Sequence, residues 1–168
     1  MSNPSPRNTG SSVGPVSSHQ STPAVYDKLG LKFMYPENWK LIDESDSESR
    51  HIVSLETPDG SCTWAVHVYP ADADRDVVLK ETLGSLRETY EDLEVSPSNA
   101  EFGTFEASGV EALFYCLDFL IKAELQVVEL DDHLLLFWAQ AEDREFDKHN
   151  LVFQAITVSL LRTLTGTS

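Results

Sequence analysis

Residues 31–39 read Leu-Lys-Phe-Met-Tyr-Pro-Glu-Asn-Trp, and this stretch predicts how the folded part of the chain begins. Large side chains recur at every second position from Leu31 to Tyr35, which is the period of a half-buried strand. Pro36 has no N–H to donate to a strand ladder, so we expect the strand to end there. Trp39 then supplies a large apolar anchor for a core. The stretch indicates an architecture and no reaction.

Further strands are predicted downstream of this motif. A short strand at 39–43 is followed by an acidic, polar stretch at 43–49, which we expect to be an exposed loop. Residues 51–56 and 61–69 form the next two strands. Asp59-Gly60 between them is a strong hairpin signal, because glycine tolerates the positive φ that a tight turn needs.

Two amphipathic helices are predicted. In residues 72–93, leucine and tyrosine side chains recur at steps of four, three, four and three, which places them on one helical face. Asp72 and Asp74 precede this helix, where aspartate caps the free N–H groups and suits the helix dipole. Residues 142–162 repeat the helical spacing with a broader apolar stripe, so we expect the second helix to be more deeply buried.

Three β-rich runs lie between the helices, at residues 104–121, 123–130 and 133–141. The last run is apolar on both faces, which is typical of a strand in the middle of a sheet covered on both sides. Short turns between consecutive strands require antiparallel pairing. We therefore predict an α+β fold, an antiparallel β-sheet flanked by helices as an α/β/α sandwich. In the first run we expect one face to form a continuous hydrophobic wall of Leu113, Tyr115, Leu117, Phe119 and Ile121.

The opening motif Tyr-Pro-Glu-Asn-Trp at 35–39 and the closing segments, Phe-Asp-Lys at 146–148 and Phe-Gln-Ala-Ile-Thr-Val-Ser at 153–159, resemble the PsbP-like superfamily. This superfamily includes PsbP of photosystem II, the Ran-binding import factor Mog and bacterial DcrB-type proteins. The resemblance implies a single domain at residues 23–168, with an antiparallel sheet between helices. It implies no function, because members have unrelated partners, and it places no photosystem-docking or Ran-docking residue on this chain.

The net charge of the chain limits the classes of molecule that it is expected to bind. There are 12 basic and 28 acidic residues, a formal net charge of −16 at pH 7. Such a surface repels phosphate groups, so we expect neither nucleic acid nor an anionic membrane as a partner. A basic protein partner suits the charge, although an acidic surface also serves solubility alone.

Composition separates a tail from the domain. Residues 1–22 are rich in serine and proline and poor in apolar side chains, so we predict a disordered tail. We find no secretory leader and no apolar stretch of about 18 residues, and we expect a cytoplasmic protein. Cys62 and Cys116 are then expected to be buried free thiols. A cross-strand disulfide and a secreted protein that has lost its leader are the alternatives.

The sequence predicts no catalytic residue, no cofactor and no metal site. Residues 72–76 imitate a calcium loop, but Val77 and Leu83 stand where that loop needs glycine and glutamate. The polar run at 131–133 fits a turn better than a metal site. Nucleophile elbows and phosphate-binding glycine loops are not found. Histidines on or beside strands are most often structural (His51, His67 and His133).

Two functions remain open. The first is a non-enzymatic binding or adaptor domain that contacts a protein partner through its acidic surface. Candidate partner-binding residues lie in the acidic loop, at Asp43, Glu44, Asp46 and Glu48. The alternative is a small-molecule-binding protein or enzyme that uses a cleft between a helix and the sheet, which requires a pocket with converging polar groups.

Overall fold

The computed structural model describes residues 22–46 and 51–166. Seven strands form one antiparallel sheet in the order β3-β4-β5-β9-β8-β7-β6, and β1 and β2 pair separately. The predicted α+β fold with an antiparallel sheet is confirmed. In chain order the elements are β1 (Pro23–Lys28), β2 (Leu31–Pro36), β3 (Lys40–Asp43), β4 (His51–Glu56), β5 (Cys62–Pro70), α1 (Arg75–Thr89), β6 (Glu94–Phe102), β7 (Phe105–Cys116), β8 (Phe119–Glu129), β9 (His133–Glu142) and α2 (Asp143–Thr165).

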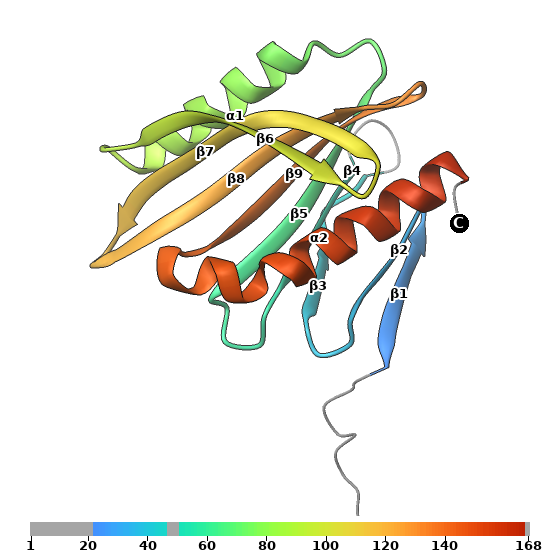
Figure 1. Ribbon diagram of the computed structural model, residues 1–168, viewed down its shortest axis with the longest axis horizontal. Coiled ribbons are helices and arrows are strands. Elements are labelled where there is room, and N and C mark those ends of the chain that lie inside the picture. The colour runs from blue at the N-terminus through green and yellow to red at the C-terminus, as the bar shows by residue number, and fades with distance from the viewer. Residues whose placement is uncertain (1–21, 47–50, 167–168) are drawn as a thin grey trace, which may run out of the picture.

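The two helices cover opposite faces of the large sheet. α2 crosses in front of the sheet with the β1–β2 pair beside it, and α1 lies behind (Figure 1). β9 is the middle strand of the seven, as its apolar pattern predicts. Its side chains alternate between two cores: Leu135 and Phe137 pack on the α2 side, and Leu134 and Leu136 on the α1 side. Burial on both faces therefore explains why this strand is apolar throughout.

The opening motif joins the first strands to both the sheet and α2. The Phe33 ring lies 5.2 Å from the Trp64 ring of β5. The Trp39 ring meets Phe153 of α2 edge to face at 6.0 Å. Met34 donates its backbone N–H to Ser159 Oγ at 2.9 Å. The motif thus acts as an anchor for the core, in agreement with its predicted role.

A buried hydrogen bond holds α2 on the sheet. Trp64 is 1% exposed, and its Nε1–H donates to Thr157 Oγ1 at 2.9 Å. Thr157 in turn donates to the carbonyl of Phe153 at 2.9 Å. Both polar groups are therefore satisfied inside an apolar interface, which fixes the rotation of α2 over β5.

The predicted hydrophobic wall is wrong. β7 ends at Cys116 and β8 starts at Phe119, so the chain reverses through Leu117 and Asp118. Leu117 has φ of 59° and is 89% exposed. The reversal carries no glycine or asparagine, and a single aspartate, Asp118, is a weak turn signal inside an apolar run. Tyr115 and Phe119 are also exposed, at 64% and 50%, so this hairpin tip presents apolar side chains to solvent.

Other boundaries also differ from prediction. Asp74 caps α1 by accepting from the N–H groups of Asp76 and Val77, as expected, but the helix ends at Thr89 rather than residue 93. The chain then forms β6, which was not predicted. This strand is polar, contains Pro97 and lies at the edge of the sheet, where a missing N–H is tolerated. The strand β1 was also missed.

Gly109 lets β7 approach β8 very closely. A Cβ atom at this position would lie 1.8 Å from the carbonyl oxygen of Leu125. β7 pairs with β8 only from Ser108 onward, and residues 105–107 pair with β6 alone. The β6–β7 hairpin therefore separates from β8 next to the point where glycine is required, and this separation opens a cleft.

The two cysteines lie apart and are free. Cys62 is buried in the core beside α2, whereas Cys116 is half-buried and interacts with Tyr90 after the end of α1. They are on opposite faces of the sheet, so the disulfide alternative is wrong. No helix in residues 22–46 and 51–166 is long and apolar enough to span a bilayer. The predicted disordered tail at 1–22 lies outside the described residues apart from Thr22.

Candidate binding surfaces

The predicted acidic loop is only partly in view. Asp43, Glu44 and Asp46 are exposed, and Glu48 lies outside the described residues. Asp43 is held in place by the fold, since it accepts from Tyr26 Oη–H at 2.7 Å and from the N–H of Ser45 at 3.0 Å. Burial raises the pKa of the Asp43 carboxyl, but these hydrogen bonds outweigh that effect and hold the pKa below its ordinary value. Its carboxylate thus has a structural task, and its role in binding stays a prediction.

Tyr26 links this carboxylate to a histidine. His51 Nε2 lies 3.1 Å from Tyr26 Oη. Burial lowers the pKa of His51, Asp43 partly offsets that effect, and nearby His133 lowers it further. His51 on β4 and His133 on β9 are not on neighbouring strands, because β5 lies between them, so His133 acts on His51 only through its charge. No group of three His, Cys, Asp or Glu side chains within the described ranges could hold a metal ion.

A cleft opens where the β6–β7 hairpin separates from β8. Its volume is about 840 Å³. We call it the acidic cleft, because three glutamates line it (Glu101, Glu106 and Glu129) together with Asn99, Ala100, Ala107, Ser108 and Val127. None of these residues was singled out from the sequence, because β6 was not predicted and its partners were unknown.

The glutamates of the acidic cleft are poorly compensated. Glu101 and Glu106 are directly paired across β6 and β7. Like charges in that position repel each other at a cost of about 0.2–1 kcal/mol. Glu129 has one cationic neighbour, Arg75, at a long 3.9 Å. Within the described part of the chain, neither Glu101 nor Glu106 forms an ion pair. The cleft therefore concentrates negative charge that a cation would relieve.

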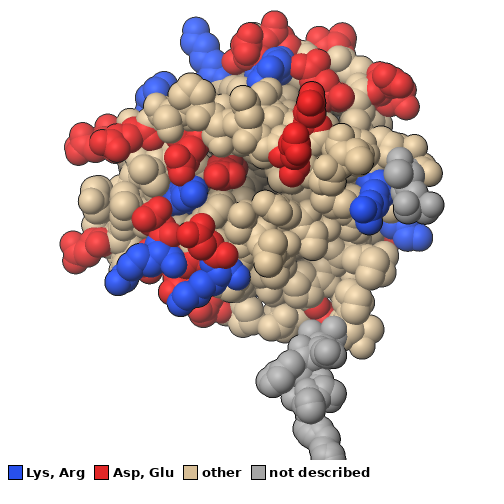
Figure 2. All heavy atoms as spheres, viewed as in Figure 1, with Lys and Arg blue, Asp and Glu red and all other residues tan. Residues whose placement is uncertain are grey.

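A second concavity lies between α2 and the sheet. Figure 2 shows this face hollowed near its centre, with acidic side chains beside the opening. The hollow holds about 20 Å³, and we call it the helix–sheet hollow. Aromatic and polar residues line it (Trp64, Phe102, Glu124, Gln126, Phe137, Ala139, Asn150, Phe153, Gln154 and Thr157). It has room for about one water-sized group.

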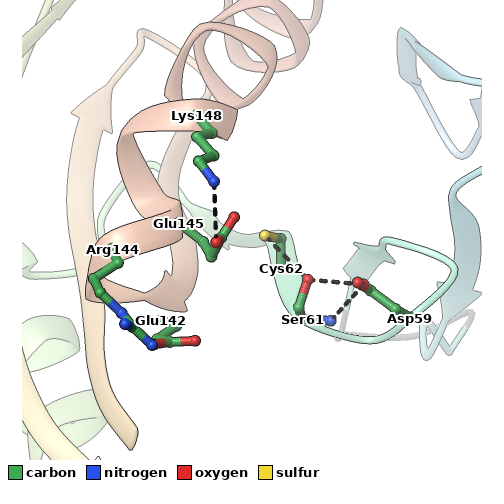
Figure 3. Close-up of polar contacts among 7 residues, drawn as sticks. All are labelled: Asp59, Ser61, Cys62, Glu142, Arg144, Glu145 and Lys148. Carbon is green, nitrogen blue, oxygen red and sulfur yellow. Dashed lines mark hydrogen bonds and ion pairs between the residues drawn. The ribbon is translucent and has the colours of Figure 1, made fainter.

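The thiol of Cys62 is not an activated nucleophile. Burial raises its pKa, and the carboxylates of Asp59 and Glu145 raise it further, although the Ser61 hydroxyl at 3.6 Å opposes them. Figure 3 shows these surroundings: the Ser61 hydroxyl donates a hydrogen bond to the Asp59 carboxylate, and Glu145 in the first turn of α2 pairs with Lys148 in the next turn at 3.2 Å. Reactive cysteines need an electropositive site, and this one is acidic.

An apolar surface forms the third candidate. The exposed hairpin tip of Tyr115, Leu117 and Phe119 stands beside a cavity of about 370 Å³, which Leu117 and Phe119 line together with Tyr90, Cys116 and Ile121. Exposed apolar groups of this kind often mark contact surfaces. The sequence did not indicate an exposed tip here, because the alternating apolar pattern of the same residues predicts one continuous buried strand face.

Comparison with known proteins relates this chain to others only through its fold. No protein-family model matches it, and no curated protein matches it. The solution structure of cyanobacterial PsbP (CyanoP) from Synechocystis sp. PCC 6803 matches with a TM-score of 0.56 and 15% identity, over 89% of this chain and 96% of that chain. A protein from Bacteroides thetaiotaomicron VPI-5482 matches with a TM-score of 0.55 and 12% identity, over 83% of this chain.

This chain covers 47% of the Bacteroides protein, so it spans about half of that protein's length. At such low identities the likenesses carry the fold and no activity. They agree with the order of elements described above and with the resemblance of the opening and closing motifs. The chain therefore has a PsbP-like fold, in which an antiparallel sheet lies between two helices.

Proposed function

We propose that this protein is a cytoplasmic, non-enzymatic binding module that recognises a basic segment of a protein partner through the acidic cleft. The observation that carries the proposal is the directly paired Glu101 and Glu106 in a cleft of about 840 Å³. A lysine or arginine between the two carboxylates replaces repulsion with attraction. The net charge of −16 attracts such a segment from a distance.

The alternative, a small molecule or substrate between helix and sheet, finds one concavity of suitable size and lining among the described residues, the cavity of about 370 Å³ beside Tyr90 and the hairpin tip. The other two concavities suit it poorly. The helix–sheet hollow holds about 20 Å³, whereas small-molecule sites occupy about 300–1,000 Å³. The acidic cleft has the required size, but its lining is mainly polar and acidic. The chemistry of that lining suits a cationic peptide, since ligand pockets for small molecules are mostly apolar.

The proposal is tested with a synthetic peptide of alternating lysine and glycine, whose binding is measured by isothermal titration calorimetry. We expect binding that weakens as salt is added, because exposed charges are screened. The double variant Glu101→Gln/Glu106→Gln should bind at least about fivefold more weakly. The matched control is Glu88→Gln/Glu91→Gln, which removes two exposed charges at the end of α1 and beyond it.

Equal affinity of the wild type and the cleft variant would contradict the proposed site. A peptide with acetylated lysines provides a second control, since acetylation removes the positive charge. Binding of that peptide at the same affinity would show that charge does not drive recognition.

A further inference from the structure

The helix–sheet hollow contains a buried acceptor without a donor. Gln126 is 1% exposed, and its Nε2–H₂ group donates to the carbonyl oxygen and the hydroxyl of Ser98, at 3.3 and 3.2 Å. The reverse orientation of the amide would set Gln126 Oε1 against the Ser98 carbonyl oxygen, where two acceptors repel each other, so the described orientation is favoured. Gln126 Oε1 is then left buried without a hydrogen-bond partner among the described residues. An unmet buried acceptor costs about 1–3 kcal/mol.

One carboxylate lines the same hollow, and two more act on it electrostatically. Glu124 lines it, and burial raises the pKa of this carboxyl above its usual value. Lys122 offsets part of the effect from 3.8 Å, while Glu111 and Asp147 add to it. Lys122 is itself shared with Glu111 at 3.2 Å. The three carboxylates therefore exceed the one ammonium group, and the site has a deficit of positive charge.

The walls of the hollow suit a cation. The aromatic rings of Trp64, Phe102, Phe137 and Phe153 line it, and aromatic faces attract cations within about 6 Å. The chain already uses this chemistry next door, where Lys122 Nζ lies 4.6 Å from the centroid of the Phe146 ring and between two glutamates. A volume of about 20 Å³ accepts a group the size of water or of –NH₃⁺.

We propose that the helix–sheet hollow is a binding subsite for a single primary ammonium group, with Gln126 Oε1 and the Glu124 carboxylate as acceptors and the aromatic rings as walls. The three N–H donors of an ammonium match these acceptors, and an alkyl chain extends outward past Asn150 and Gln154. The hollow shares no lining residue with the acidic cleft. Ammonium binding in the hollow and peptide binding in the acidic cleft can therefore be tested, and refuted, independently.

The test uses NMR of the full chain and two salts of equal charge. Methylammonium chloride and tetramethylammonium chloride are added to the protein in separate titrations at constant ionic strength. The indole N–H signals of the three tryptophans are followed in each titration. Trp64 lines the hollow, whereas Trp39 and Trp138 do not and serve as internal controls. We expect a saturable shift of the Trp64 signal with methylammonium only, because tetramethylammonium has no N–H donor and exceeds the available volume.

Variants separate the acceptors from general charge. Glu124→Gln and Gln126→Leu should each weaken methylammonium binding by about tenfold. Glu88→Gln on α1, at the other face of the sheet, should leave it unchanged. Glu124→Gln leaves the contacts of Gln126 to Ser98 in place, so it remains informative if Gln126→Leu folds poorly.

A third ligand, the peptide acetyl-Gly-Lys-Gly-amide, identifies the source of the ammonium group. Tighter binding than methylammonium assigns the site to a lysine of a protein, and weaker binding assigns it to a free amine. The proposal is overturned if both salts shift Trp64 equally, or if no saturable shift occurs. In that event the hollow holds water only.

Discussion

The change Gly109→Ala should destabilise the fold strongly, although it adds only one methyl group. The new Cβ atom would stand 1.8 Å from the Leu125 carbonyl oxygen and 2.8 Å from its carbon, and Cβ contacts below 3.0 Å essentially do not occur. β7 must therefore move from β8 by at least about 1 Å, which strains the ladder at Gln126. Overpacking costs about 1–3 kcal/mol, and here the obstacle is rigid backbone, so we expect about 3 kcal/mol or more.

The matched control is Gly84→Ala in α1, where no atom lies within 4 Å of the added Cβ. Alanine favours helix over glycine by about 0.5–1 kcal/mol, so this change should stabilise the protein. Urea unfolding followed by circular dichroism gives the free energy of unfolding for both variants. A loss below about 1 kcal/mol for Gly109→Ala would refute the close contact of β7 and β8 and the cleft geometry that depends on it.

Three further perturbations test local energetics by the same unfolding assay. Burial lowers the pKa of His51, so on acidification the unfolded chain takes up a proton at a higher pH than the folded protein does. The free energy of unfolding should therefore fall as the pH drops below about 6.5, and His51→Gln should remove this contribution to the pH dependence. Since burial raises the pKa of Glu124, its ionised form strains the fold, and Glu124→Gln should stabilise the protein at pH 7 but not near pH 4. Trp64→Phe loses buried volume and the bond to Thr157, and it should cost about 2 kcal/mol, whereas an unchanged midpoint would contradict the described packing.

Much of the architecture follows from periodicity. The closing helix, the hairpin at Asp59-Gly60 and the central place of β9 were predicted because burial on one or two faces imposes a simple repeat on the side chains. The motif at 31–39 was also predicted as an anchor, because a tryptophan after a proline-terminated strand has few other uses. These features depend on local patterns, which a single sequence displays.

The candidate surfaces were harder to foresee, because they depend on which strands are neighbours. Glu101 and Glu106 lie opposite each other only because β6 pairs with β7. The polar composition of β6, which is typical of an edge strand, resembles that of a loop, so this pairing was not predicted. The turn at Leu117 uses a leucine at positive φ, so an apolar run concealed a reversal. The buried Gln126 acceptor without a donor depends on where β6, β8 and α2 come together, and no local sequence pattern indicates it.

The most direct test of the central claim is to map where a basic peptide binds. Backbone amide shifts of the full chain are followed by NMR while the alternating lysine–glycine peptide is added. We expect the largest shifts on the backbone that lines the acidic cleft, at Ala100, Ala107, Ser108 and Val127. Shifts concentrated on residues 43–46, or on the hairpin tip at Tyr115, Leu117 and Phe119, would contradict it.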